Sequence, residues 1–265
     1  MRVVSAIVLL VVIFGTLWLL PAWVTVLLVA VVAWLGAREL ADMARHLQLD
    51  VPSLFVGPAA AVVSVALVAS LDGYAPEALT GVLLALVVAA GAVTLAQGPP
   101  APGVPGRAAT IVMAPLYVGL PLGVFAWLQC MYGPAVTTWL LAMIAVSDSG
   151  QYYCGRTFGR SKLAPSVSPA KTREGAIGGV AVAAIVGAVT GPMVMPDVPM
   201  VMAGALTLVL ALAGIVGDLF ESLVKRSAGV KDSSQLIPGH GGILDRVDSH
   251  LFAAPVFYFF LRYFV

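Results

Sequence analysis

Residues 78–96 read ALTGVLLALVVAAGAVTLA, an uncharged apolar run bounded by Glu77 and Gln97. A helix needs ~20 residues to cross the ~30 Å hydrocarbon core of a bilayer, and this run is long enough. Lipid offers no hydrogen-bonding partners, so the backbone of such a run must satisfy its own polar groups, as a helix does. The run therefore predicts a membrane-spanning helix.

Comparable apolar runs recur along the whole chain of 265 residues. With 78–96 they number about nine, and the others are 3–20, 22–40, 53–71, 109–128, 135–152, 176–195, 199–217 and 250–264. The runs are continuous, whereas the strands of a membrane barrel alternate in polarity. Only 10% of residues are charged and mean hydropathy is +1.01, against about 25% charged in soluble domains. We expect an all-α, polytopic integral membrane protein.

Lys and Arg concentrate in every second predicted loop. The basic loops are 38–50, 97–108, 153–175 and 218–249. The positive-inside rule places basic loops in the cytoplasm. We therefore expect a bacterial-type inner (plasma) membrane protein with a cytoplasmic N-terminus and a C-terminus on the other side. The first run lacks a clear small-x-small cleavage site and is interpreted as a retained helix.

Polar groups at membrane depth are concentrated in the C-terminal half of the chain. Asp148 and Asp218 each follow an apolar run, and a carboxylate at a helix centre in the bilayer costs ~2.5 kcal/mol or more. Such a residue either reaches the interface from a helix end or faces a polar cavity. We predict that residues 1–134 form a scaffold and dimer region and that residues 135–265 form the catalytic region.

The densest polar stretch begins where the predicted span 199–217 ends. Asp218 is followed at +3, +4 and +7 by Glu221, Ser222 and Lys225. If the helix continues past residue 217, these side chains share one face. That face is either a charge network at a helix end or a metal ligand joined to a phosphate-binding lysine.

A glycine-rich turn, Pro238-Gly239-His240-Gly241-Gly242, comes next. Its glycines accept positive φ and let backbone N–H groups approach an anionic ligand closely. Asp245 and Asp248 follow at i, i+3, and Arg246 between them offers a planar fork to phosphate oxygens. For His240, a backbone-orienting role and proton transfer both stay open.

Carboxylates interspersed with lysines and arginines indicate metal-assisted chemistry on phosphates. Mg²⁺ takes oxygen ligands and typically binds one or two carboxylates together with substrate phosphates. A solvated cytoplasmic loop would also be charged, but the regular spacing and the glycine-rich turn weigh against that alternative. No Gly-Lys-Ser/Thr ending is present, which argues against a P-loop nucleotide site.

A second basic cluster spans residues 156–175. Its simplest role is contact with anionic lipid headgroups, worth about 1 kcal/mol per basic residue. Ser168, Lys171 and Thr172 precede the predicted span 176–195 and could instead hold a phosphate at a helix N-terminus. Both roles stay open from the residues alone.

Residues 222–248 read SLVKRSAGVKDSSQLIPGHGGILDRVD. This segment closely resembles the signature of the phosphatidate cytidylyltransferase (CDP-diglyceride synthase) family, in which Ser, Lys-Arg, Lys-Asp, His-Gly-Gly and Asp-Arg-x-Asp follow in this order. Residues 147–175 are also similar to the family, through Asp148, Tyr152, Gly155-Arg156 and the run from Ser168 to Gly175. The chain departs from the common pattern at 149–151 and at Arg173, which bears on substrate fit rather than on metal ligands.

The resemblance implies an all-helical membrane homodimer that transfers CMP from CTP to phosphatidic acid, giving CDP-diacylglycerol and pyrophosphate. It also implies an active site that faces the cytoplasm and depends on Mg²⁺, with a second cation close by and metal ligation by Asp218 and Asp245. The expected catalytic residues are Asp218, Asp245, Lys225, Asp148 and His240. The expected substrate-binding residues are Ser222, Arg226, Lys231, Asp232, Gly241, Gly242, Arg246, Asp248, Lys171 and Thr172.

Two other functions are compatible with parts of the pattern. A CTP-dependent polyprenol or lipid kinase would use the same nucleotide but transfer its γ-phosphate. A secondary transporter would also place charges at membrane depth, but it should show related repeats with paired polar sites in both halves. Here the polar groups crowd into one half, which favours an enzyme acting on CTP and a membrane lipid, with no nucleic acid as partner.

Overall fold

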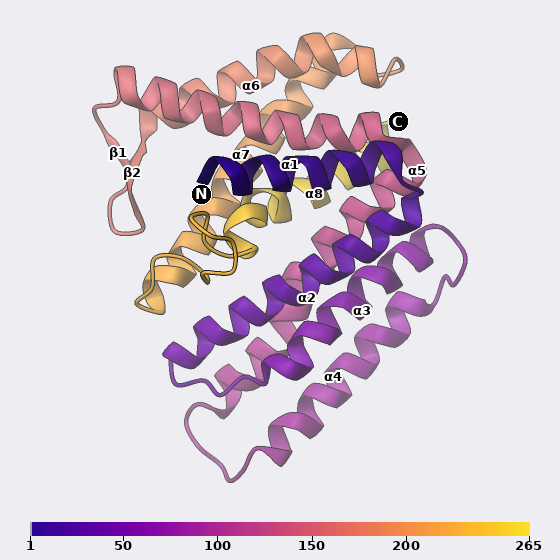
Figure 1. The fold of residues 1–265 in the computed structure, drawn as a ribbon, viewed down its shortest axis with the longest axis vertical. Helices are drawn as coiled ribbons and strands as arrows, with labels where there is room; N and C mark the ends of the chain where they lie inside the picture. The colour runs from indigo at the N-terminus through magenta and orange to yellow at the C-terminus, as the bar shows by residue number, and fades with distance from the viewer. Residues whose placement is uncertain (1) are drawn as a thin grey trace. The chain divides into compact units, whose positions relative to one another are not determined.

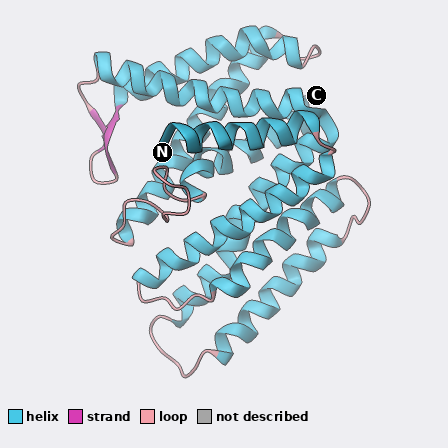
Figure 2. Ribbon diagram, in the orientation of Figure 1, coloured by secondary structure: helices cyan, strands magenta, loops and turns pink. Residues whose placement is uncertain are grey.

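The computed structural model describes residues 2–265, and they are mostly helical (Figures 1 and 2). In chain order the elements are α1 (Arg2–Leu19), α2 (Ala22–His46), α3 (Ser53–Leu71), α4 (Ala78–Ala96), α5 (Val104–Phe158), β1 (Lys162–Ala164), β2 (Ser168–Thr172), α6 (Arg173–Val194), α7 (Met200–Ser227) and α8 (Leu244–Phe264). This confirms the predicted all-α class. The short antiparallel hairpin β1–β2 interrupts the predicted loop 153–175.

The chain forms two compact units. The first comprises Met1–Met131 with Val224–Arg246, and the second comprises Tyr132–Leu223 with Val247–Val265. Most of the signature segment therefore packs with the N-terminal helices, a grouping that the linear sequence does not suggest. The predicted division at residue 134 concerns roles rather than packing, and it stays a prediction.

Six of the described helices, α2 to α7, are long and apolar enough to cross a bilayer. The predicted spans 109–128 and 135–152 both fall within α5, which is interrupted at Gly133 by a non-helical φ of 76° and ψ of −175°. Helices α1 and α8 cover the predicted spans 3–20 and 250–264 but are not among the six. The protein is an integral membrane protein, and the count of nine spans stays a prediction.

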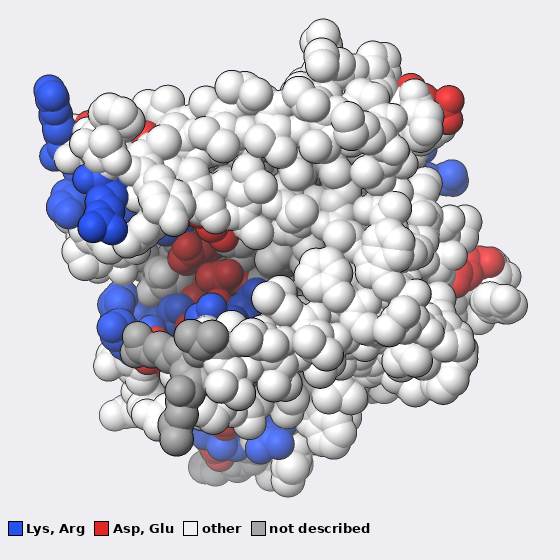
Figure 3. Space-filling view, turned by 45° about the horizontal axis from the view of Figure 1, so that its top comes forward, with Lys and Arg blue, Asp and Glu red and all other residues white. Residues whose placement is uncertain are grey.

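Large apolar side chains cover much of the outer surface. On α4, Leu84, Val88 and Leu95 are 66%, 74% and 81% exposed. Figure 3 shows one face of the molecule, and large areas of it carry no charged side chain. Contiguous apolar surface of this extent is what lipid covers in a membrane protein.

In the first unit, α2, α3 and α4 run side by side (Figure 1). The first half of α5 packs closely against α3 at Gly119 and Gly123. A Cβ on Gly119 would lie 2.6 Å from the carbonyl oxygen of Ala60, and one on Gly123 would lie 2.8 Å from that of Ser64. Without side chains at these positions the two backbones can approach, as is common between membrane helices.

In the second unit, α6 presents a buried stripe of small residues at intervals of four: Gly175, Gly179, Ala183, Gly187 and Gly191. These positions lie on one helix face and contact α5 and α7. Small residues at these positions let the neighbouring helices approach closely. Helix α7 continues past residue 217 to Ser227, so Asp218, Glu221, Ser222 and Lys225 do lie on one helix.

Gly187→Ala is expected to lower the apparent melting temperature of the purified protein. The added Cβ would lie only 1.9 Å from the Thr207 hydroxyl oxygen of α7, so the helices must separate. Such overpacking costs about 1–3 kcal/mol. Gly91→Ala on α4 is the control, because nothing lies within 4 Å of its Cβ and Ala favours a helix. Equal melting temperatures for the two variants would contradict this packing.

Candidate functional site

One charged cluster lies in the second unit and draws on β2, α5 and α7. Lys171, near the end of β2, forms an ion pair with Oδ2 of Asp218 on α7. Ser222, one turn later, donates its hydroxyl to Oδ1 of Asp218 at 3.3 Å. Asp148 on α5 accepts a hydrogen bond from Gln151 at 3.0 Å and lies within electrostatic range of Lys171 and Asp218. Four predicted site residues, from three separate parts of the chain, therefore meet here.

The Lys171 and Asp218 side chains are 19% and 27% exposed, although the Nζ atom of Lys171 itself is buried. They are less buried than Lys225 and Asp245, whose side chains are 11% and 6% exposed. A phosphate that binds the Lys171 ammonium, or a cation that binds the Asp218 carboxylate, can therefore replace the internal partner at lower cost than at Asp245. This combination is typical of an ion-binding site rather than of a structural anchor.

Short polar contacts hold the hairpin that carries Lys171. Glu174 accepts backbone hydrogen bonds from Arg160 and Ser161 at 3.0 and 3.1 Å. The Thr172 hydroxyl accepts the backbone N–H of Gly175 at 3.1 Å and so caps the N-terminus of α6. The structure thus gives Thr172 a capping role, and the phosphate-binding role stays a prediction.

The second charged cluster lies in the first unit and is centred on Asp245. Oδ1 of Asp245 accepts a hydrogen bond from Lys225 Nζ at 2.6 Å, and these side chains are only 6% and 11% exposed. Oδ2 accepts the backbone N–H groups of Ser233 and Gly242 at 2.9 and 2.8 Å. The Ser233 hydroxyl also donates to Oδ2 at 2.8 Å. Asp245 therefore joins the end of α7 to the start of α8.

The environment of Asp245 favours its ionised form. Burial by itself would raise the pKa of Asp245, but the hydrogen bond from Lys225, the backbone N–H groups of Gly242 and Ser233, and the lysine charge outweigh it. The net result is a pKa below the ordinary value. The carboxylate is therefore charged at neutral pH, and the ion pair opens only as acid protonates it.

The glycine-rich turn adopts the conformation that its sequence predicts. Gly239 and Gly241 have φ values of 78° and 80°, a region that disfavours other residues. A Cβ on Gly241 would lie 2.6 Å from Oδ2 of Asp245. The glycines are therefore required so that the turn can wrap around the carboxylate.

His240 is positioned by α1 rather than by the charged residues. Its Nδ1 lies 2.9 Å from the hydroxyl oxygen of Ser5, and that hydroxyl also lies 3.1 Å from the carbonyl oxygen of Pro238. The contact holds the turn against the N-terminal helix. It supports the orienting role for His240, while proton transfer stays a prediction.

The other predicted substrate-binding residues of the signature differ in exposure. Arg226, Lys231, Asp232 and Arg246 are exposed. Arg226 donates to the carbonyl oxygen of Val230 at 3.2 Å. Asp248 is partly buried and accepts the backbone N–H of Ser249 at 2.7 Å. Exposed cations of this kind raise the local concentration of anionic ligands.

Glu39 on α2 is a buried carboxylate that is not among the site residues predicted from the sequence. It is 5% exposed and accepts four hydrogen bonds, all from residues 233–244 of the signature segment. Its position inside the predicted span 22–40 was the available signal, because an acidic residue in an apolar run requires partners.

Oxygen ligands of the type that Mg²⁺ prefers are present in both clusters. The Asp218 carboxylate is the more accessible, whereas both oxygens of Asp245 already accept hydrogen bonds. Among the described residues, no group of three or more His, Cys, Asp and Glu side chains forms a metal cage. Mg²⁺ usually keeps several waters and binds through few carboxylates, so the donor chemistry fits.

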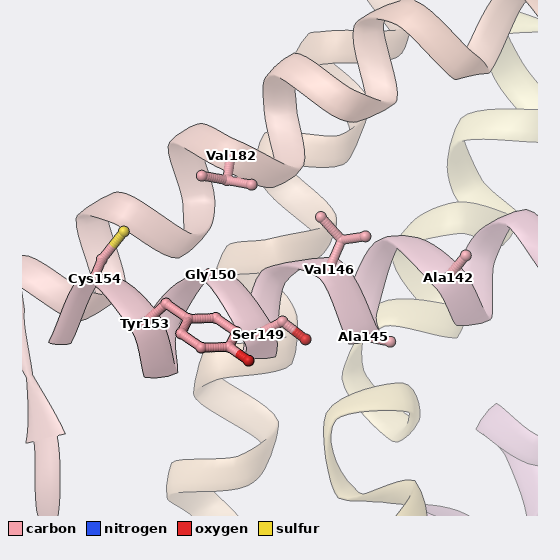
Figure 4. Close-up of a pocket in the computed structure, with 8 residues that line it drawn as sticks. All are labelled: Ala142, Ala145, Val146, Ser149, Gly150, Tyr153, Cys154 and Val182. Atoms are coloured by element: carbon pink, nitrogen blue, oxygen red, sulfur yellow. The ribbon is translucent and has the colours of Figure 1, made fainter. Parts of the chain in front are cut away.

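An apolar groove of about 520 Å³ runs along α5 in the second unit (Figure 4). It is lined by Ala142, Ala145, Val146, Ser149, Gly150, Tyr153, Cys154 and Val182, the last from α6. No charged side chain lines it, so its lining suits hydrocarbon and not a triphosphate. One lining residue, Ser149, follows Asp148 in the sequence, but no residue of the charged cluster lines the groove.

Comparisons with known proteins agree with the signature. The model of the cytidylyltransferase family matches residues 1–264. A phosphatidate cytidylyltransferase of Bacillus subtilis (strain 168) is 38% identical over 156 residues, which cover 58% of each chain. One from a Synechocystis species is 46% identical over 130 residues, covering 49% of this chain and 44% of that protein.

Another relative has no stated activity. The uncharacterized protein YnbB of Escherichia coli (strain K12) is 44% identical over 133 residues, covering 49% of this chain and 44% of that protein. The chain spans about half the length of these curated relatives. The family model, in contrast, matches nearly every residue. On that match, the chain belongs to the cytidylyltransferase family.

Proposed function

We propose that this protein transfers the cytidylyl group of CTP to phosphatidic acid, forming CDP-diacylglycerol and pyrophosphate. Two of the similar proteins carry the name phosphatidate cytidylyltransferase. The observation that carries the proposal is the signature segment folded around Asp245, with Lys225 and two backbone N–H groups on its carboxylate. Lys171 and Asp218 form a second set of phosphate- and cation-binding groups.

The nucleophile is an oxygen of the lipid phosphate. It attacks the α-phosphorus of CTP, the new P–O bond forms, and the bond from the α-phosphorus to the bridging oxygen of the β-phosphate breaks. Pyrophosphate leaves with that electron pair. A phosphate monoester has a second pKa of about 6, so the attacking oxygen is already anionic at neutral pH. No side chain needs to act as general base, and catalysis rests on positioning and charge neutralisation.

The cationic side chains have distinct tasks in this proposal. Lys171, whose ion pair is partly exposed, binds a phosphate once Asp218 is occupied by a cation. Lys225 is buried on Asp245 and keeps that carboxylate and the glycine-rich turn in place. The exposed Arg226, Lys231 and Arg246 attract the triphosphate and the lipid headgroup.

Mg²⁺ is the proposed cofactor, and the carboxylates of Asp218 and Asp245 are the proposed ligands. The more exposed Asp218 is the readier of the two, because a cation on Asp245 must first displace one of its hydrogen-bond donors. When bound, it would neutralise charge on the triphosphate as the α-phosphorus reacts. Chelation of divalent ions with EDTA is expected to reduce turnover by roughly 100-fold or more, and added Mg²⁺ should restore it. Full activity in EDTA would exclude a dependence on divalent cations.

The wider assignment is also proposed. The basic loops support a cytoplasmic active site and N-terminus in a bacterial-type inner membrane. A homodimer rests on the family resemblance. A single-cysteine substitution at Asp197, in the non-basic loop between α6 and α7, should react with an impermeant maleimide only from the outside of intact cells.

Labelled nucleotide tests the reaction directly. Purified protein in detergent is incubated with phosphatidic acid, Mg²⁺ and CTP carrying ³²P at either the α- or the γ-position. We expect α-label in the lipid product and γ-label in pyrophosphate. Transfer of γ-label to the lipid would identify a kinase instead. The absence of label from the lipid in both reactions would reject the cytidylyltransferase assignment.

A further inference from the structure

Glu39 connects α2 to the signature segment through four hydrogen bonds. Its Oε1 accepts the Ser234 hydroxyl at 2.6 Å and the Ile243 backbone N–H at 2.9 Å. Its Oε2 accepts the Ser233 hydroxyl at 2.9 Å and the Leu244 backbone N–H at 2.8 Å. One buried carboxylate therefore holds both ends of the loop that contains the glycine-rich turn.

Two of these hydrogen bonds cap the N-terminus of α8 with a side chain that is far away in the sequence. Leu244 is the first residue of α8, and the backbone N–H groups at a helix start have no partner within the helix. Glu39 satisfies the N–H groups of Ile243 and Leu244, and its negative charge suits the positive end of the helix dipole. The first backbone N–H of α8 thus has a partner about 200 positions earlier in the chain.

The Ser233 hydroxyl connects Glu39 to Asp245. Its oxygen lies 2.9 Å from Oε2 of Glu39 and 2.8 Å from Oδ2 of Asp245. A hydroxyl has only one proton, so the two carboxylates share a single donor. A shift of either carboxylate therefore changes the hydrogen bonding of the other.

The space around this junction permits no larger side chain. A Cβ on Gly242 would lie 2.1 Å from the Ser233 hydroxyl oxygen and 2.4 Å from Oε2 of Glu39. The signature glycine therefore leaves room for a carboxylate that arrives from α2. A glycine is therefore needed at position 242 partly because Glu39 occupies the adjacent space, and not only because a phosphate ligand must approach the backbone.

We propose that Glu39 is a positioning residue for the cytidylyl transfer, because it holds the 233–244 loop and, through Ser233, the orientation of Asp245. The proposal rests on the proposed function for its catalytic part. The N-terminal helices then do more than form a scaffold, since α2 completes the support of the signature loop. Glu39 acts through Asp245 and the turn, and it touches no reacting atom.

Glu39→Gln tests the proposal in the purified full-length protein. The glutamine amide keeps the size of the side chain but presents N–H groups to donors that need acceptors. We expect amide hydrogen exchange to accelerate in peptides that cover 230–244 while exchange in α3 and α4 stays unchanged. Turnover should fall by roughly 10- to 100-fold. Glu39→Asp, which keeps the charge, should recover part of both.

Asp42→Asn on the same helix is the matched control. The Asp42 side chain is 47% exposed and pairs with Arg45 rather than with the loop, so neither exchange nor turnover should change. If Glu39→Gln does not fold, Ser234→Ala decides the matter, because it removes one of the four hydrogen bonds. Normal loop exchange and normal turnover in whichever variant folds would overturn the proposal.

The two readouts also separate this proposal from the proposed function. If the wild-type protein forms no CDP-diacylglycerol, the reaction assignment fails, while hydrogen exchange still shows whether Glu39 holds the loop. If the loop loosens in Glu39→Gln but turnover stays at the wild-type value, Glu39 is a structural anchor and its positioning role is rejected.

Discussion

Asp245→Asn is expected to abolish measurable cytidylyl transfer and to lower the apparent melting temperature. The carboxylate accepts hydrogen bonds on both oxygens, from Lys225 at 2.6 Å and from three donors of Ser233 and Gly242. An asparagine would turn an amide N–H₂ group toward one of these donors and remove the carboxylate charge that pairs with the buried Lys225. Removing one partner of a buried pair costs about 3–5 kcal/mol.

A second substitution separates stability from catalysis at this site. Adding Lys225→Met to Asp245→Asn removes the buried ammonium that has lost the Asp245 carboxylate, so the melting temperature should recover in part. Turnover should not recover, because the carboxylate and the lysine are both missing. Melting in detergent and label transfer from α-labelled CTP measure the two effects. Wild-type turnover in Asp245→Asn would reject every catalytic role proposed for this residue.

Asp218→Asn is expected to reduce turnover by roughly 10³-fold, the scale of losing a major electrostatic contact in a transition state. Its melting temperature should fall less than that of Asp245→Asn, because the side chains of the Lys171–Asp218 pair are more exposed than those of Lys225 and Asp245. The exposed Asp197, in the connection between α6 and α7, supplies the control Asp197→Asn. Equal losses in both variants would point to a general charge effect.

Lys171→Met distinguishes two explanations for an effect at Asp218. If Asp218 serves only to orient Lys171, the single variants and the double variant should lose similar amounts of activity. If Asp218 binds a cation, Asp218→Asn should lose far more activity than Lys171→Met, and its activity should respond to Mg²⁺ at higher concentrations. Activity measured across a Mg²⁺ titration supplies the comparison.

The polar contacts of the site differ in how far they can be inferred from sequence. The spacing of Asp218 and Ser222 predicts their shared helix face, and the structure contains that hydrogen bond. The spacing does not predict that Lys171, on a hairpin 47 positions away, pairs with Asp218, because charge attraction has no fixed separation along the chain. The tertiary structure shows this pair, because the hairpin and residues 200–223 of α7 belong to the same compact unit.

Sequence alone determined the membrane-embedded, all-helical class and the residues of the signature segment. Both are local properties, since span length follows from apolar runs and the motif is contiguous. Only the tertiary structure showed that the signature loop packs with the N-terminal helices and that Glu39 holds it. A buried carboxylate needs donors, but hydropathy cannot say which distant backbone N–H groups will supply them, because that depends on how helices pack.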